Sequence, residues 1–133
     1  MAREIKIVRA QAEQFFDDWL EAMDIDFSVA DEDDKGTRER IIKAITHGDL
    51  TFSEDGEAVY TPWRPKSKHK DPVTFYERTG DVVLASDGKG KNALARQTFA
   101  MMGKLCQVDP KVFSQMAGTD IKVCEGLFSL LMV

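Results

Sequence analysis

Two histidines and two cysteines are the side chains of this chain best suited to metal binding or nucleophilic catalysis. His47 follows a helical pattern and His69 lies in a lysine-rich stretch, so neither has the spacing of a metal pair or of a nucleophile with its base. Cys106 and Cys124 lie in apolar helical patterns without CxxC spacing, which predicts buried free thiols in a reducing compartment. We therefore predict no catalytic residue, no metal site, no cofactor and no enzymatic activity.

Two further segments resemble ligand-binding loops only in part. Residues 87–91 contain two glycines and two lysines, but their order differs from that of a phosphate-binding P-loop, and we interpret residues 86–91 as a linker. Asp31, Asp33 and Gly36 match the first half of a calcium-binding EF-hand loop. Its twelfth position is Ile42, where a bidentate glutamate is needed, so we interpret residues 24–36 as a solvated acidic loop.

Composition and charge place the chain among cytoplasmic globular proteins. It has 133 residues, of which 43% are hydrophobic and 31% charged, and this predicts one domain over residues 1–133. It contains no apolar run near the ~20 residues that span a bilayer, and its start lacks a secretory signal. Residues 1–34 hold eleven acids and three bases, a balance of -8, which leaves +3 of the net -5 for the rest.

The basic segment 62–72 has two interpretations. It combines Trp63 with four bases and His69, as single-strand nucleic-acid binders do, and a small nucleic-acid-binding regulator is our alternative function. The overall negative charge opposes approach to phosphates, so we favour contact with the acidic loop of a neighbouring copy. The predicted oligomer contacts are Arg64, Lys66, Lys68 and Lys70 on one copy and Asp31 and Asp33 on the other.

Periodicity predicts an α+β fold with a small antiparallel sheet over residues 49–85. Strands are expected at Glu4–Val8, Leu50–Phe52, Ala58–Tyr60 and Val73–Glu77, with a hairpin turn at Asp55-Gly56. Helices are expected at Ala10–Met23 and Thr37–His47, followed by a block of three helices over residues 92–133. In that block Asn92, Asp109 and Thr119 are the expected caps.

Two apolar helix faces are the candidate partner-binding surfaces. The first helix carries aromatic residues on one face, and the last helix is apolar nearly all round. Such faces fill the core of a monomer or contact a partner; both outcomes are open for the first helix, and for Leu130–Val133 we expect exposure or a subunit contact. The predicted partner-binding residues are Phe15, Phe16, Trp19, Met23, Leu127, Phe128, Leu130, Leu131 and Met132.

The second half of the chain resembles the tail assembly chaperones of long-tailed, lambda-like bacteriophages. The likeness rests on VTFYERTGDV at residues 73–82 and ARQTFAMMGKLCQVDP at residues 95–110, and it covers roughly residues 73–133. These segments are similar to the family's order of a strand, a Thr-Gly-Asp turn, a helix, a small-residue break, a short helix and a final helix after an aspartate. Asp120 stands at the place of that aspartate.

The resemblance implies a non-enzymatic protein of the host cytoplasm that is not part of the mature virion. It implies binding to the tape measure protein, which is kept soluble until tail tube protein polymerises around it. It further implies a homo-oligomer and a longer frameshift product that contacts the tail tube protein. The apolar faces agree with such a role, because helices are recognised by apolar grooves.

Overall fold

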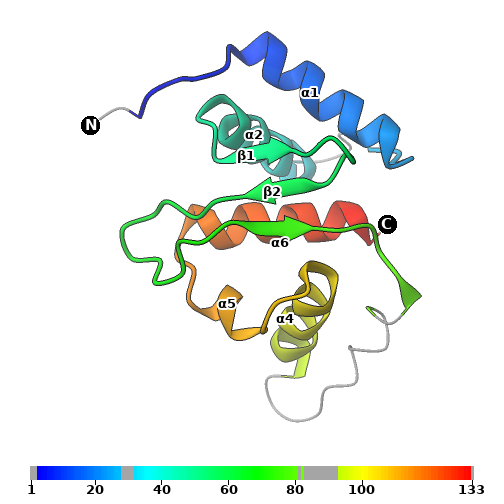
Figure 1. The fold of residues 1–133 in the computed structure, drawn as a ribbon, viewed down its shortest axis with the longest axis vertical. Coiled ribbons are helices and arrows are strands. Elements are labelled where there is room, and N and C mark those ends of the chain that lie inside the picture. Colours follow the sequence, from blue (N-terminus) through cyan, green and yellow to red (C-terminus); the bar gives the residue numbers. More distant parts are fainter. Residues whose placement is uncertain (1–2, 28–31, 81, 83–92, 133) are drawn as a thin grey trace.

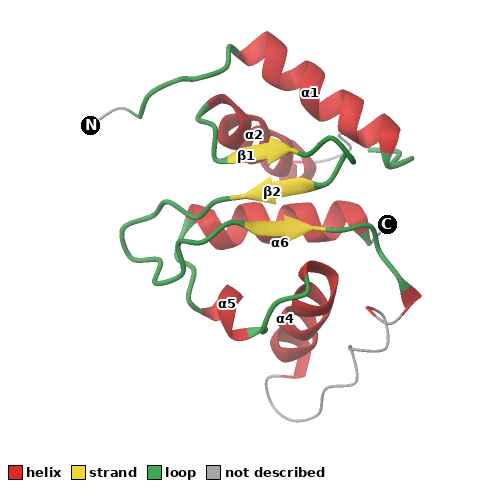
Figure 2. Ribbon diagram, viewed as in Figure 1, coloured by secondary structure: helices red, strands yellow, loops and turns green. Residues whose placement is uncertain are grey.

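The computed structural model of the chain describes residues 3–27, 32–80, 82 and 93–132. Helices pack around a three-stranded antiparallel sheet, which confirms the predicted α+β class. Figure 1 shows α2 and α6 behind the sheet, α1 across one end of these layers, and α4 with α5 at the other end. Figure 2 shows the same view coloured by secondary structure. The elements are α1 (Arg9–Ala22), α2 (Glu32–Thr46), β1 (Leu50–Phe52), β2 (Ala58–Tyr60), β3 (Val73–Phe75), α4 (Ala93–Cys106), α5 (Lys111–Ser114) and α6 (Thr119–Leu131).

The sheet has the strand order β1-β2-β3, so the predicted hairpin and the strand that joins it are both confirmed. Tyr60 lies opposite Leu50 on one side and opposite Val73 on the other. Gly56 has a φ of 82°, which a residue without Cβ adopts freely, and this lets the chain reverse after Asp55. Alternation places one set of strand side chains in the core: Leu50, Ala58, Tyr60, Val73 and Phe75.

The first helix, α1, matches its predicted bounds within a residue, whereas α2 begins earlier than predicted. The acidic run from Glu32 to Asp34 forms the first turn of α2, so the predicted acidic loop is wrong for residues 32–36. Carboxylates at this position face the positive end of the helix dipole, which stabilises a helical turn and offsets their mutual repulsion. Residues 28–31 of that loop lie outside the described residues.

The predicted strand Glu4–Val8 is wrong. The segment is an extended arm along the end of α2, where the backbone N–H groups of Lys6 and Ile7 both donate to the carbonyl oxygen of Thr46, at 2.8 and 3.1 Å. Alternation alone does not make a strand here, because the arm meets a helix end instead of the edge of the sheet. Ile5 and Val8 consequently remain 67% and 65% exposed.

The C-terminal block folds into three helices, as predicted. Asp109 caps α5, since its Oδ1 accepts the N–H of Lys111 at 2.9 Å. Gly103 lets α4 approach the next turn closely, because a Cβ there would lie 2.9 Å from the carbonyl oxygen of Val108. The predicted cap Thr119 is instead the first residue of α6, after Gly118. Asn92 and the linker 86–91 lie outside the described residues.

Within the described parts of the chain, no helix is both long and apolar enough to cross a bilayer.

Candidate partner-binding surface

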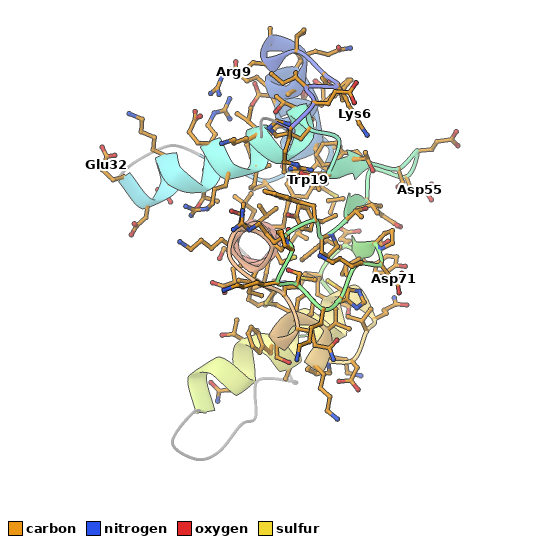
Figure 3. All side chains as sticks on the ribbon, turned by 90° about the vertical axis from the view of Figure 1, so that its left-hand side faces the viewer. Lys6, Arg9, Trp19, Glu32, Asp55 and Asp71 are labelled. Carbon is orange, nitrogen blue, oxygen red and sulfur yellow. The ribbon has the colours of Figure 1, made fainter. Side chains whose placement is uncertain are left out.

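The aromatic face of α1 is mostly used inside the molecule. Phe16 is fully buried and Trp19 is 3% exposed. The two rings stack at a centroid distance of 6.2 Å, and Trp19 stacks on Phe52 of β1 at 5.6 Å. Figure 3 shows Trp19 between α1 and the rest of the fold. Of the two outcomes open for this face, the structure therefore shows core packing for Phe16 and Trp19.

The apolar residues of α6 are also largely internal. Leu127 is fully buried, and Leu130 and Leu131 are 4% and 7% exposed. The expectation of an exposed last turn is therefore wrong for Leu130 and Leu131, while Val133 lies outside the described residues. The physical reason is the position of α6 behind the sheet and against α2, where a helix that is apolar nearly all round has partners on several sides (Figure 1).

Four of the predicted partner-binding residues keep accessible surface. Phe15 is 37% exposed, and Met23, Phe128 and Met132 are half-buried. Phe15 also lines a shallow hollow of about 220 Å³ between α1 and the β1–β2 hairpin. The hollow is lined by Phe15, Asp18, Trp19, Ala22, Phe52 and Gly56. Here α1 and the hairpin together expose apolar surface.

Beside the start of α6, a buried carboxylate organises the basic loop 62–72. Asp120 is fully buried, and its Oδ1 accepts the hydroxyl of Tyr60 at 2.6 Å. Its Oδ2 accepts the Ser67 hydroxyl at 2.6 Å and the backbone N–H of Arg64 at 2.9 Å. The N–H of Trp63 lies 3.2 and 3.1 Å from the two oxygens. These donors compensate the carboxylate for its lost hydration.

The loop is therefore fixed where it crosses α6, although it has no regular secondary structure. Ser67 is 2% exposed, and its Oγ also accepts the N–H of Ala117 at 2.8 Å. The N–H of Lys68 donates to the carbonyl oxygen of Gln115 at 2.7 Å. The loop predicted to be exposed is thus exposed at its charged side chains and buried at its centre.

Burial also changes the acidity of three groups in this half of the molecule. Desolvation, followed by the hydrogen bond to Asp120, raises the pKa of Tyr60 well above its usual value. Desolvation likewise raises the pKa values of the Cys106 and Cys124 thiols. The two cysteines are free, as predicted. Their thiols are held in the un-ionised form, which is the poor nucleophile.

The predicted oligomer contacts remain a prediction. Arg64, Lys66, Lys68 and Lys70 are exposed on the loop, and the Lys70 ammonium donates to the carbonyl oxygen of Arg64. Asp33 is exposed in the first turn of α2, and Asp31 lies outside the described residues. Figure 3 places Glu32, in the same turn as Asp33, and Asp71, at the end of the loop, on opposite sides of the molecule.

The hydrogen bonds of Tyr60 and Ser67 to Asp120 were not anticipated from the sequence, because these residues lie 53 to 60 positions from the aspartate. One signal was present. An aspartate in the first turn of an otherwise apolar helix has to find donors, and here they come from the end of β2 and from the loop that precedes β3.

Comparisons of the chain with protein-family models, with curated proteins and with solved structures found no match.

Proposed function

We propose that the chain is a phage tail assembly chaperone that binds the tape measure protein and keeps it soluble while the tail tube polymerises. The proposal rests on the resemblance of residues 73–133, and the observation that supports it best is the apolar hollow beside Phe15. Two aromatic walls of the hollow, Trp19 and Phe52, stack on each other, and Trp19 is buried, so these walls are in place before a partner arrives.

A helix is a suitable occupant of this hollow. An amphipathic helix presents apolar side chains at intervals of three and four residues, and one or two such side chains fit a depression of about 220 Å³. Phe15 offers the exposed aromatic contact, and Trp19, one helical turn away and 3% exposed, lines the hollow beside it. Binding that covers apolar surface of the partner helix withdraws it from aggregation.

The alternative function, nucleic-acid binding by the basic loop, has less structural support. A base would have to stack on Trp63, but the Arg3 guanidinium lies over that ring at 3.7 Å and that of Arg64 at 5.1 Å. The ring is thus engaged by the protein's own cations, which leaves the exposed lysines to act through charge alone.

The proposal is tested by co-expression with fragments of a long, largely helical tape measure protein encoded near this chain. We expect the fragment to become soluble and to co-purify with the chain. Phe15→Asp places a charge in the hollow and should abolish the rescue, because a carboxylate facing an apolar helix stays desolvated and unpaired. A fragment that stays insoluble with the wild-type chain would refute the proposed function.

Val8→Asp is the matched control, since it adds the same charge at an apolar residue that is 65% exposed and lies outside the hollow. This variant should rescue the fragment as well as the wild-type chain does. Equal loss of rescue in both variants would show that added charge, and not the hollow, is responsible.

A further inference from the structure

A second pocket, distinct from the hollow at Phe15, lies between the N-terminal arm, the end of α2 and the start of the basic loop. Its volume is about 570 Å³, within the range of roughly 300–1,000 Å³ that small-molecule sites occupy. Ile5, Ala44 and Trp63 supply apolar surface, and basic side chains come from three separate segments.

The pocket is positively charged, whereas the chain as a whole is negatively charged. The chain carries a net charge of -5, yet the pocket lining includes Arg3, Arg40, Lys43 and Arg64 with a single carboxylate, Asp49. Asp49 is already neutralised by Arg3, whose two terminal nitrogens donate to its two oxygens at 2.6 and 2.5 Å. Three cations are left over at this site.

These three cations have no carboxylate partner in the described parts of the chain. None of the ion pairs among the described residues includes Arg40, Lys43 or Arg64. The Nε of Arg40 is buried and has no protein acceptor among those residues. A buried N–H without an acceptor and cations without a paired carboxylate both destabilise the free protein. An oxyanion bound in the pocket supplies the missing counter-charge.

The walls of the pocket are fixed in advance. Arg3 is held by Asp49 and stacks on Trp63 at 3.7 Å. The Trp63 backbone is held in turn by the Asp120 carboxylate, and the arm that carries Arg3 is anchored to the end of α2 through Thr46. This wall of the pocket, made of Arg3 and Trp63, therefore needs little ordering when an anion binds.

We propose that this pocket binds the phosphate group of a small phosphorylated molecule. Two guanidinium groups and an ammonium provide charge-assisted donors that match a doubly charged, three-oxygen acceptor better than a single carboxylate. The apolar surface of Ile5 and Ala44 takes the organic part of the ligand. A long polyanion is disfavoured, because the chain as a whole carries a net charge of -5 and repels it at long range.

Inorganic phosphate is the first probe, titrated into the full chain at constant ionic strength and followed by NMR. We expect saturable shifts of the Trp63 indole and of backbone amides around Arg40 and Arg64. Acetate at the same ionic strength should give much smaller shifts. Equal responses to phosphate and acetate, or no saturable response to phosphate, would overturn the proposal.

The double variant Arg40→Gln/Lys43→Gln should weaken phosphate binding by about tenfold or more, because it removes two charge-assisted donors. Lys43→Gln alone changes an exposed side chain, so it preserves the fold and should weaken binding measurably even if the double variant does not fold. Unchanged binding in Lys43→Gln and in a folded double variant would refute the assignment.

Lys66→Gln/Lys68→Gln is the matched control, since it removes two positive charges from exposed loop residues outside the pocket. Phosphate binding should persist in this variant. A single-stranded oligonucleotide is the last probe. Binding of this oligonucleotide that is tighter than that of phosphate and is lost in the Lys66/Lys68 variant would assign the basic surface to nucleic acid and overturn the small-molecule proposal.

Discussion

Helix α1 and the loop 62–72 are attached to the rest of the protein by different kinds of buried contact. The buried face of α1 is held through aromatic rings: Phe16 and Trp19 stack on each other, and Trp19 stacks on Phe52. Ion pairs at the surface, such as Arg9–Glu39, also join α1 to α2. The loop is held through hydrogen bonds to one carboxylate, that of Asp120, which accepts from side-chain hydroxyls and backbone N–H groups. Both regions are buried. Among the described residues, the buried polar side-chain atoms of the second region all have hydrogen-bond partners, whereas the first region contains a buried N–H without one.

The indole N–H of Trp19 shows the difference at a single atom. It is buried and has no protein acceptor among the described residues. The burial of apolar area tolerates such a defect, because the hydrophobic effect is not directional. A buried carboxylate tolerates none, since each missing donor leaves charge uncompensated.

The two kinds of buried contact position different parts of the protein. Apolar packing holds the buried face of α1 to the body of the protein and leaves Phe15 37% exposed at the surface, where we propose that a partner binds. The polar centre fixes the path of a loop that has three prolines at or within its ends and no regular structure, and it thereby fixes Trp63 and Arg64 at the second pocket. Each proposed binding place thus depends on a different kind of interior.

The largest effect on stability is expected from Phe16→Ala in the apolar region. Removing a fully buried ring deletes its packing and leaves a cavity, so the free energy of unfolding should fall by about 3–5 kcal/mol. Urea-induced unfolding followed by circular dichroism measures the change. Phe15→Ala, one residue away and 37% exposed, is the control and should cost much less. Equal losses would show that α1 is not attached through the face on which Phe16 lies.

Asp120→Asn tests the polar region and should cost about 3 kcal/mol. The amide keeps the shape of the carboxylate, but it removes the charge and turns one acceptor into a donor that faces other donors. Hydrogen exchange should also accelerate at the N–H groups of Trp63 and Arg64, whereas amides in α1 should exchange as before.

Asp55→Asn is the control for charge removal, because Asp55 is exposed in the hairpin turn. It should leave both the unfolding free energy and the loop exchange unchanged within error. If Asp120→Asn accelerated exchange throughout α1 as well, the two regions would be one cooperative unit, and the division between them would be wrong.

The fold was largely predictable because the spacing of residues within each segment indicates its secondary structure. Apolar spacing located α1 and the C-terminal helices, and the Asp55-Gly56 step located the hairpin. The start of α2 was missed because a run of acids reads as a loop unless its position at a helix N-terminus is known. The arm at residues 4–8 was misread because alternation says nothing about whether a sheet edge is within reach.

The candidate sites were less predictable because they depend on contacts distant in sequence. The residue pattern indicates that α6 is apolar nearly all round. It does not indicate whether a second copy or the core of the same chain covers Leu130 and Leu131. The second pocket combines Arg3, Arg40 and Arg64, and their convergence follows from tertiary packing alone. Only Phe15 was both predicted from the helical pattern and found partly exposed beside a hollow.

Tyr60→Phe gives the smallest and most selective effect, because it removes one donor from Asp120 and keeps the ring in the core. It should cost about 1–2 kcal/mol near neutral pH. The raised pKa of Tyr60 adds a pH dependence of known sign. The folded state binds the phenol proton more tightly than the unfolded state, so this contribution is complete below the unfolded pKa of about 10 and is lost as the pH rises above it.

The wild-type unfolding free energy should therefore fall above about pH 10 with an extra slope of up to about 1.4 kcal/mol per pH unit, which Tyr60→Phe lacks. Other groups titrate in both proteins, so the difference between the two urea-derived curves isolates Tyr60. Curves that run parallel from neutral to alkaline pH would mean that Tyr60 ionises as readily in the folded chain as in the unfolded one. In that case the Tyr60 hydroxyl would not donate to Asp120, and Asp120 would not be hydrogen-bonded to the sheet through β2.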